Sequence, residues 1–223
     1  MTSLLYFFSS FPEAVFWLLL SGLIFLTMTI IFLLGPFRTD RSELMQGFLG
    51  FLGGMTWFHI FLGIGMYQGS HNFNTLAAFG AVTGSAFLLK FPLLALQNKV
   101  VRKNLFYTVL GIGWLMILWL FFFPHQPETP MIVGSIYMII VSGAIGGSYI
   151  LWKGFQLEDP ALKIKCIGGG CSVILCCFLT HIIVLTVGMT ILAKTFMLLT
   201  PVELIFALYF ARALEQRKTL ETP

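Results

Sequence analysis

The stretch that decides the fold is Ala14 to Phe37, AVFWLLLSGLIFLTMTIIFLLGPF, in which no side chain carries a charge. A bilayer core of about 30 Å requires about 20 consecutive apolar residues in a spanning helix. This stretch is long enough, and residues 1–12 contain no Lys or Arg, whereas a secretory signal begins with a basic segment. We therefore expect a retained membrane-spanning helix over residues 13–37.

The composition of the whole chain supports the same class. Of the 223 residues, 58% are hydrophobic and only 10% are charged, and the mean hydropathy is +0.92. A soluble domain carries about 25% charged residues, so this chain lacks the polar surface that a soluble protein needs. The apolar residues form long runs and not the short alternating segments of a barrel. The sequence predicts an all-α integral membrane protein in contact with the lipid bilayer.

Further apolar runs follow, separated by short polar connections that leave no room for a soluble domain. The chain is therefore predicted to form a single polytopic domain, residues 1–223, a bundle of seven transmembrane helices. The expected spans are residues 13–37, 47–68, 76–97, 105–124, 131–154, 167–188 and 190–212.

The basic residues predict the orientation of this bundle. Eleven of the 13 Lys and Arg residues fall in the first, third and fifth connections, at their edges, or in the C-terminal tail. Cytoplasmic loops carry such an excess of Lys and Arg. We expect the N-terminus outside and the C-terminus in the cytoplasm, in a cell (inner) membrane. The net charge of +4 is spread over loops and forms no dense patch, which argues against nucleic-acid binding.

Spans 1–3 and 5–7 share some local features. Glycines precede His59 in span 2 and His181 in span 6, and spans 3 and 7 each contain one proline, Pro92 and Pro201. Parallel repeats of this kind occur in transporters. The pattern suggests a 3+1+3 repeat in which span 4 joins the two halves. Coincidence in a chain rich in Gly and Pro is the alternative.

Two charged residues lie inside predicted spans. Glu203 follows Pro201 in span 7, and Lys90 lies in the cytoplasmic half of span 3. An ionised group in mid-bilayer costs at least about 2.5–3.5 kcal/mol on insertion scales, so such groups face the interior and find partners. One interpretation is a Lys90–Glu203 ion pair on a substrate or proton path. In the other, Lys90 extends to the interface and Glu203 is protonated or held by a hydroxyl.

His59 and His181 are expected in the outer halves of spans 2 and 6. If the two imidazoles face each other, they could ligate a b-type haem or another metal. A structural role for each, without cofactor, is the favoured alternative. The metal, if any, stays open.

Glycines mark the helices that pack closely. Spans 2, 5 and 6 contain groups of glycines, and small residues let membrane helices approach each other. The groups are Gly47, Gly50, Gly53 and Gly54; Gly143, Gly146 and Gly147; and Gly168, Gly169 and Gly170. We expect spans 2, 5 and 6 to form the tight interior.

Three functional classes remain open. The first is a small-solute or ion transporter or channel-like protein, with a polar path between spans 2, 3, 6 and 7 formed by Glu203, Lys90, His59 and His181. The second is a non-catalytic sensor, assembly factor or complex subunit, with a membrane partner or a second copy. The third is a redox subunit with haem between His59 and His181. No soluble-enzyme motif is present, which disfavours an enzyme without excluding one.

Overall fold

A computed structural model describes residues 11–35, 38, 43–122, 129–187, 198 and 202. The described part is helical. Its elements are α2 (Phe11–Leu34), α4 (Glu43–Gln68), α5 (His71–Leu93), α6 (Lys99–Phe122), α7 (Thr129–Phe155), α8 (Pro160–Val173), the π-helical turn η1 (Ile174–Leu179) and α9 (Thr180–Val187). Of the predicted span 190–212, the structure describes residues 198 and 202 alone.

Five of these helices are long and apolar enough to cross a membrane, namely α2, α4, α5, α6 and α7. They contain 23–27 residues each, which at about 1.5 Å per residue exceeds a hydrocarbon core of about 30 Å. The described part is therefore all-helical, as predicted, and its five candidate spans are consistent with a helical membrane protein. The seven-span count and the orientation stay predictions.

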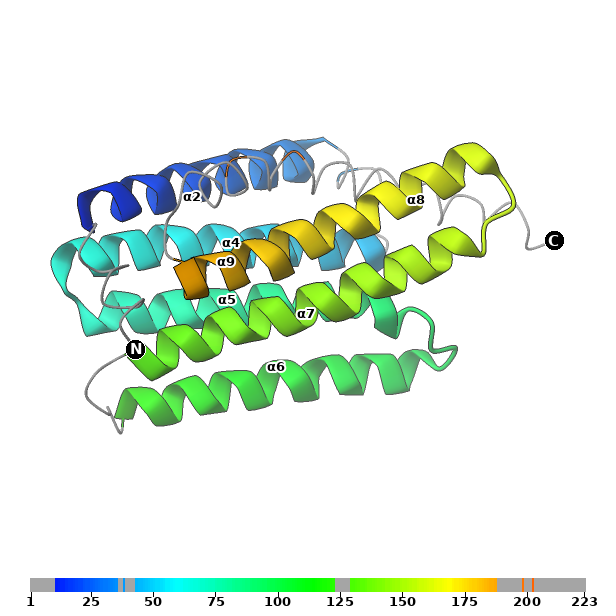
Figure 1. Ribbon diagram of the computed structural model, residues 1–223. Helices are drawn as coiled ribbons and strands as arrows, with labels where there is room; N and C mark the ends of the chain where they lie inside the picture. Colours follow the sequence, from blue (N-terminus) through cyan, green and yellow to red (C-terminus); the bar gives the residue numbers. More distant parts are fainter. Residues whose placement is uncertain are drawn as a thin grey trace.

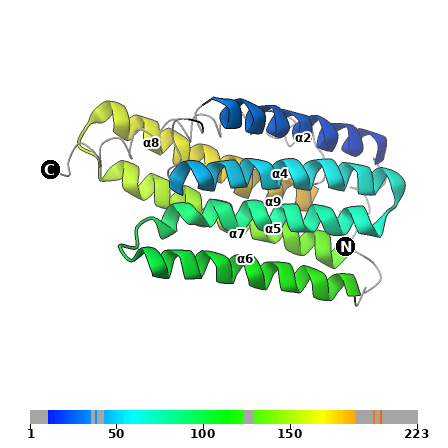
Figure 2. The same ribbon diagram turned by 180° about the vertical axis from the view of Figure 1, so that it is seen from behind.

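The helices run side by side and alternate in direction (Figures 1 and 2). Their neighbours follow the order α2, α4, α5, α7, α8, and α6 packs on α5. The core lies among α2, α4, α5 and α7, where Phe25, Leu52, Ala81 and Ile139 are each fully buried. α6 is much more exposed, because it meets the bundle mainly through α5.

Close helix contacts depend on glycines. A Cβ on Gly54 of α4 would clash with the backbone of Gly84 in α5, and one on Gly80 of α5 would lie 2.6 Å from the backbone nitrogen of Phe58. Where α7 meets the helical segment that begins with α8, a Cβ on Gly147 of α7 or on Gly170 of α8 would overlap atoms of the facing helix. The prediction from spans 2, 5 and 6 therefore missed one partner, since α5 supplies Gly80 and Gly84 to the tightest contact.

The helices extend beyond the predicted spans at their polar ends. α5 begins at His71 and not at residue 76, because Gly69 adopts a left-handed backbone (φ 62°) that turns the chain within two residues. α6 begins at Lys99 and not at residue 105. There the side-chain oxygen of Asn98 accepts hydrogen bonds from the backbone N–H groups of Val100 (2.9 Å) and Val101 (3.2 Å).

α8 begins at Pro160, seven residues before the predicted start of span 6, and proline suits a first helical position. α8, η1 and α9 follow one another without a break from residue 160 to 187. For the third helix of the suggested second repeat, residues 198 and 202 alone are described. The repeat therefore stays a prediction.

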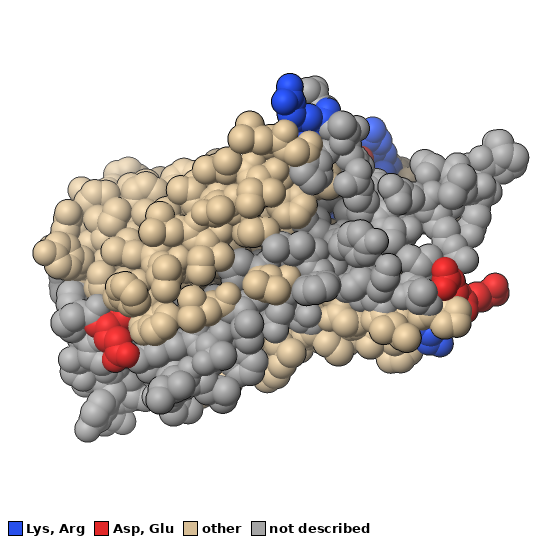
Figure 3. Space-filling view, turned by 90° about the horizontal axis from the view of Figure 1, so that it is seen from above, with Lys and Arg blue, Asp and Glu red and all other residues tan. Residues whose placement is uncertain are grey.

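Charged residues mark one end of the bundle. The Lys and Arg side chains visible in Figure 3 lie toward the end where α5 and α7 finish and α6 and α8 begin. We call this the basic end. It contains Arg38, Lys99, Arg102, Lys103, Lys153 and Lys163. Glu13 lies at the start of α2, at the opposite end.

Candidate functional site

His59 is an interior residue of α4 with an exposure of 3%. Its Nδ1 lies 2.8 Å from the backbone carbonyl oxygen of Met55, one turn earlier. A carbonyl oxygen only accepts, so Nδ1 carries the proton and donates it to this bond. In the neutral imidazole, Nε2 then keeps its lone pair, which can accept a proton or bind a metal.

Aromatic rings surround this imidazole. Phe25 of α2 stacks on it, with ring centroids 5.2 Å apart and planes at 18°, and Phe58 meets its edge at 5.1 Å. α2 can approach so closely because residue 22 is glycine, where a Cβ would lie 2.6 Å from Ile60 Cγ1. The position of His59 is thus fixed by packing from two helices.

His181 lies on α9, immediately after an irregular turn. In η1, residues Ile174–Leu179 form π-helical hydrogen bonds, and the Thr180 hydroxyl donates to the Leu175 carbonyl at 2.9 Å. Such π turns often occur at functional sites. His181 is partly buried and close enough to His59 for the two imidazoles to interact electrostatically. The fold therefore brings the two predicted histidines into the same region of the bundle.

Ser21 adds a polar atom to the α2 side of this interior. It is 2% exposed, and its hydroxyl oxygen has no hydrogen-bond partner among the described residues. Ser21 and Phe25 are four residues apart and share a helix face. The sequence contained a signal for it, since Ser21 is a lone serine in the middle of the first apolar run.

Lys90 and the two histidines lie at different positions along the bundle axis. Lys90 is partly buried near the end of α5, with its Nζ 4.6 Å from the ring centroid of Phe106 and 5.2 Å from that of Phe87. It packs opposite Gly47, which is 12 residues before His59 in α4, or about 18 Å along the axis. Lys90 and the histidines do not form one compact site. Glu203 lies outside the described residues, so the Lys90–Glu203 pair stays a prediction.

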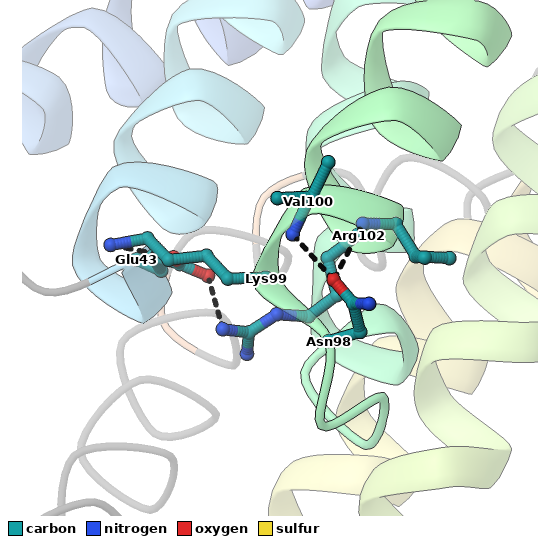
Figure 4. Close-up of polar contacts among 6 residues, drawn as sticks. Glu43, Asn98, Lys99, Val100 and Arg102 are labelled. Atoms are coloured by element: carbon teal, nitrogen blue, oxygen red, sulfur yellow. Dashed lines mark hydrogen bonds and ion pairs between the residues drawn. The ribbon is translucent and has the colours of Figure 1, made fainter.

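The acidic residue that interacts electrostatically with Lys90 is Glu43, at the start of α4. Figure 4 shows Glu43 with Lys99 and Arg102. The Glu43 carboxylate lies 3.6 Å from Arg102 Nη2 and 4.0 Å from Lys99 Nζ. These contacts connect α4 with the start of α6. Lys99 and Arg102 were expected in the third connection, and their convergence on Glu43 could not be predicted because it depends on how the helices pack.

The donor set limits the choice of metal. Among the described residues, no group of three or more His, Cys, Asp or Glu side chains could hold a metal ion. A structural zinc site needs four ligands, so the described donors do not supply one. Two histidines on different helices are the donor type that a b-type haem uses.

These features indicate a multi-pass helical membrane protein that contains the buried His59 and, near it, the partly buried His181. No family model matches the chain, and the comparisons with curated proteins and with solved structures also found no match.

Proposed function

We propose that the protein is a membrane transporter or channel for a small solute or ion, with its polar site at His59 and His181. The observation that supports this is the buried His59, with the partly buried His181 near enough to interact with it electrostatically, because ionisable groups are costly in a membrane and commonly mark substrate or proton paths. The unpartnered Ser21 hydroxyl supplies a further polar group on the same side of α4 as Phe25.

The predicted path continues toward the basic end through Lys90 and, in span 7, Glu203. In this account His59 and His181 bind or relay in one half of the membrane, and Lys90 with Glu203 in the other. The irregular η1 turn before His181 suits such a path, because discontinuous helices supply backbone groups to transporter sites.

Uptake into proteoliposomes tests this function. A fixed panel of labelled monovalent cations, amino acids and hexoses is offered to the wild type and to variants His59→Ala, His181→Ala and Glu203→Gln. We expect uptake of at least one solute, abolished in each variant. His71→Ala is the matched control, since His71 stacks on Phe121 at the outer end of α5 and should leave uptake intact. Wild-type uptake by the three variants would contradict the proposed path.

A second candidate is a b-type haem subunit, favoured by the lone pair on Nε2 of His59 and the nearby His181. An ultraviolet–visible spectrum of the purified protein, oxidised and then reduced with dithionite, separates the two. A Soret band that is lost in His59→Ala and His181→Ala would replace transport by electron transfer. A featureless spectrum would leave the transport proposal in place.

A further inference from the structure

A group of cations converges at the basic end, between α5 and α6. We define the α5–α6 basic cluster as Lys90, Lys99, Arg102 and Lys103. Three of these meet Glu43: Arg102 and Lys99 as ion pairs at 3.6 and 4.0 Å, and Lys90 electrostatically. The ammonium of Lys103 lies 5.9 Å from the ring centroid of Tyr107.

Among the residues that the structure describes, the cluster carries more positive charge than Glu43 balances. One carboxylate serves three cations, and Lys103 adds a fourth positive charge one residue after Arg102. The side chain of Lys99 is 79% exposed, so its charge reaches the surface. An anion at this surface would therefore meet a net positive field.

Lys90 brings a charge from the candidate membrane span α5 into this cluster. It belongs to the membrane-spanning helix α5, yet its ammonium lies over Phe106 of α6. This contact places a charge in the seam between the two helices, beside apolar rings. Because Lys90 lies in the last turn of a candidate membrane span, the phosphate of a lipid headgroup is the anion expected beside it.

The adjoining surface of α6 is apolar and exposed. Val100 is 66% exposed, Val101 43% and Leu105 43%. Acyl chains can lie along this face while a headgroup meets the cations. The backbone N–H groups of Val100 and Val101 already bond Asn98, so the side chains and not the helix N-terminus would hold the anion.

We propose that the α5–α6 basic cluster binds the phosphate of an anionic phospholipid in the leaflet at the basic end. Arg102 and Lys90 hold the phosphate, and the acyl chains follow α6. Charge-assisted hydrogen bonds from a guanidinium fit phosphate oxygens. This inference does not depend on transport.

Native mass spectrometry of the full-length protein tests it, with phosphatidylglycerol and phosphatidylcholine offered at equal concentration. We expect the wild type to retain phosphatidylglycerol in preference to phosphatidylcholine. In the double variant Lys90→Gln, Arg102→Gln, the ratio of retained phosphatidylglycerol to retained phosphatidylcholine should fall about tenfold. The matched control is Lys153→Gln, Lys163→Gln, which removes the same charge from another part of the basic end. Equal losses in both double variants, or no preference in the wild type, would overturn the proposal.

Two further measurements keep the result interpretable. If the double variant does not fold, as judged by gel filtration, Arg102→Lys keeps the charge but removes the fork of donors, and it should still lower the preference. Inorganic phosphate is added as a competitor. Retention of the lipid supports a headgroup site, and complete displacement by phosphate alone would overturn it in favour of a free-anion site.

Discussion

Gly53 and Gly54 are neighbours in α4 with different surroundings. A Cβ on Gly54 would clash with backbone atoms of Gly84, whereas a Cβ on Gly53 would meet nothing within 4 Å. Because the clash involves backbone, no rotamer change relieves it. The close contact between α4 and α5 therefore requires glycine at position 54.

We expect Gly54→Ala to lower the free energy of unfolding by about 1–3 kcal/mol, the usual cost of overpacking. Gly53→Ala is the control and should be neutral or stabilising by up to about 1 kcal/mol, because alanine favours helix. Thermal unfolding of both variants in detergent measures the difference. Equal melting temperatures would show that α4 and α5 are not in this close contact.

At the scale of elements, the η1 turn holds one more residue than an α-helix would. Deleting Leu179, a partly exposed residue of η1, should convert the turn to regular α-helix and keep the faces of α8 and α9 in place. Deleting Ile145 from the regular helix α7 instead rotates every later residue by about 100° and displaces the core face.

Size-exclusion profiles and melting curves of the two deletion variants compare these outcomes. The Leu179 deletion should remain monodisperse and unfold close to the wild type, and the Ile145 deletion should aggregate. If the Leu179 deletion is the more damaging of the two, then η1 is not an inserted turn.

The helices could be predicted from the sequence, because long apolar runs are typical of membrane-spanning helices. The polar ends of the helices could not be predicted in this way. The first turns at His71, Lys99 and Pro160 depend on local caps and turn geometry, which hydropathy does not report. The π turn was also missed, because it is a change of hydrogen-bond register within an apolar run. Ser21 and the convergence on Glu43 likewise require knowledge of which helices are neighbours.

At the scale of the whole molecule, the histidine pair was predicted as two candidates without knowledge of whether they face each other. The structure brings the two histidines near each other, and it places Lys90 closer to the basic end of the bundle. The bundle has several candidate membrane spans, and we predict that its basic end lies in the cytoplasm. Gln68 is an exposed residue at one end of the bundle, and Gln97 is an exposed residue at the basic end.

Membrane-impermeant maleimide labelling of single cysteines tests this orientation most directly, in a variant without the native cysteines expressed in the bacterial inner membrane. We predict that Gln68→Cys is labelled in intact spheroplasts and Gln97→Cys only after permeabilisation, because a membrane separates the two ends. Labelling of both positions from the same side would contradict the account.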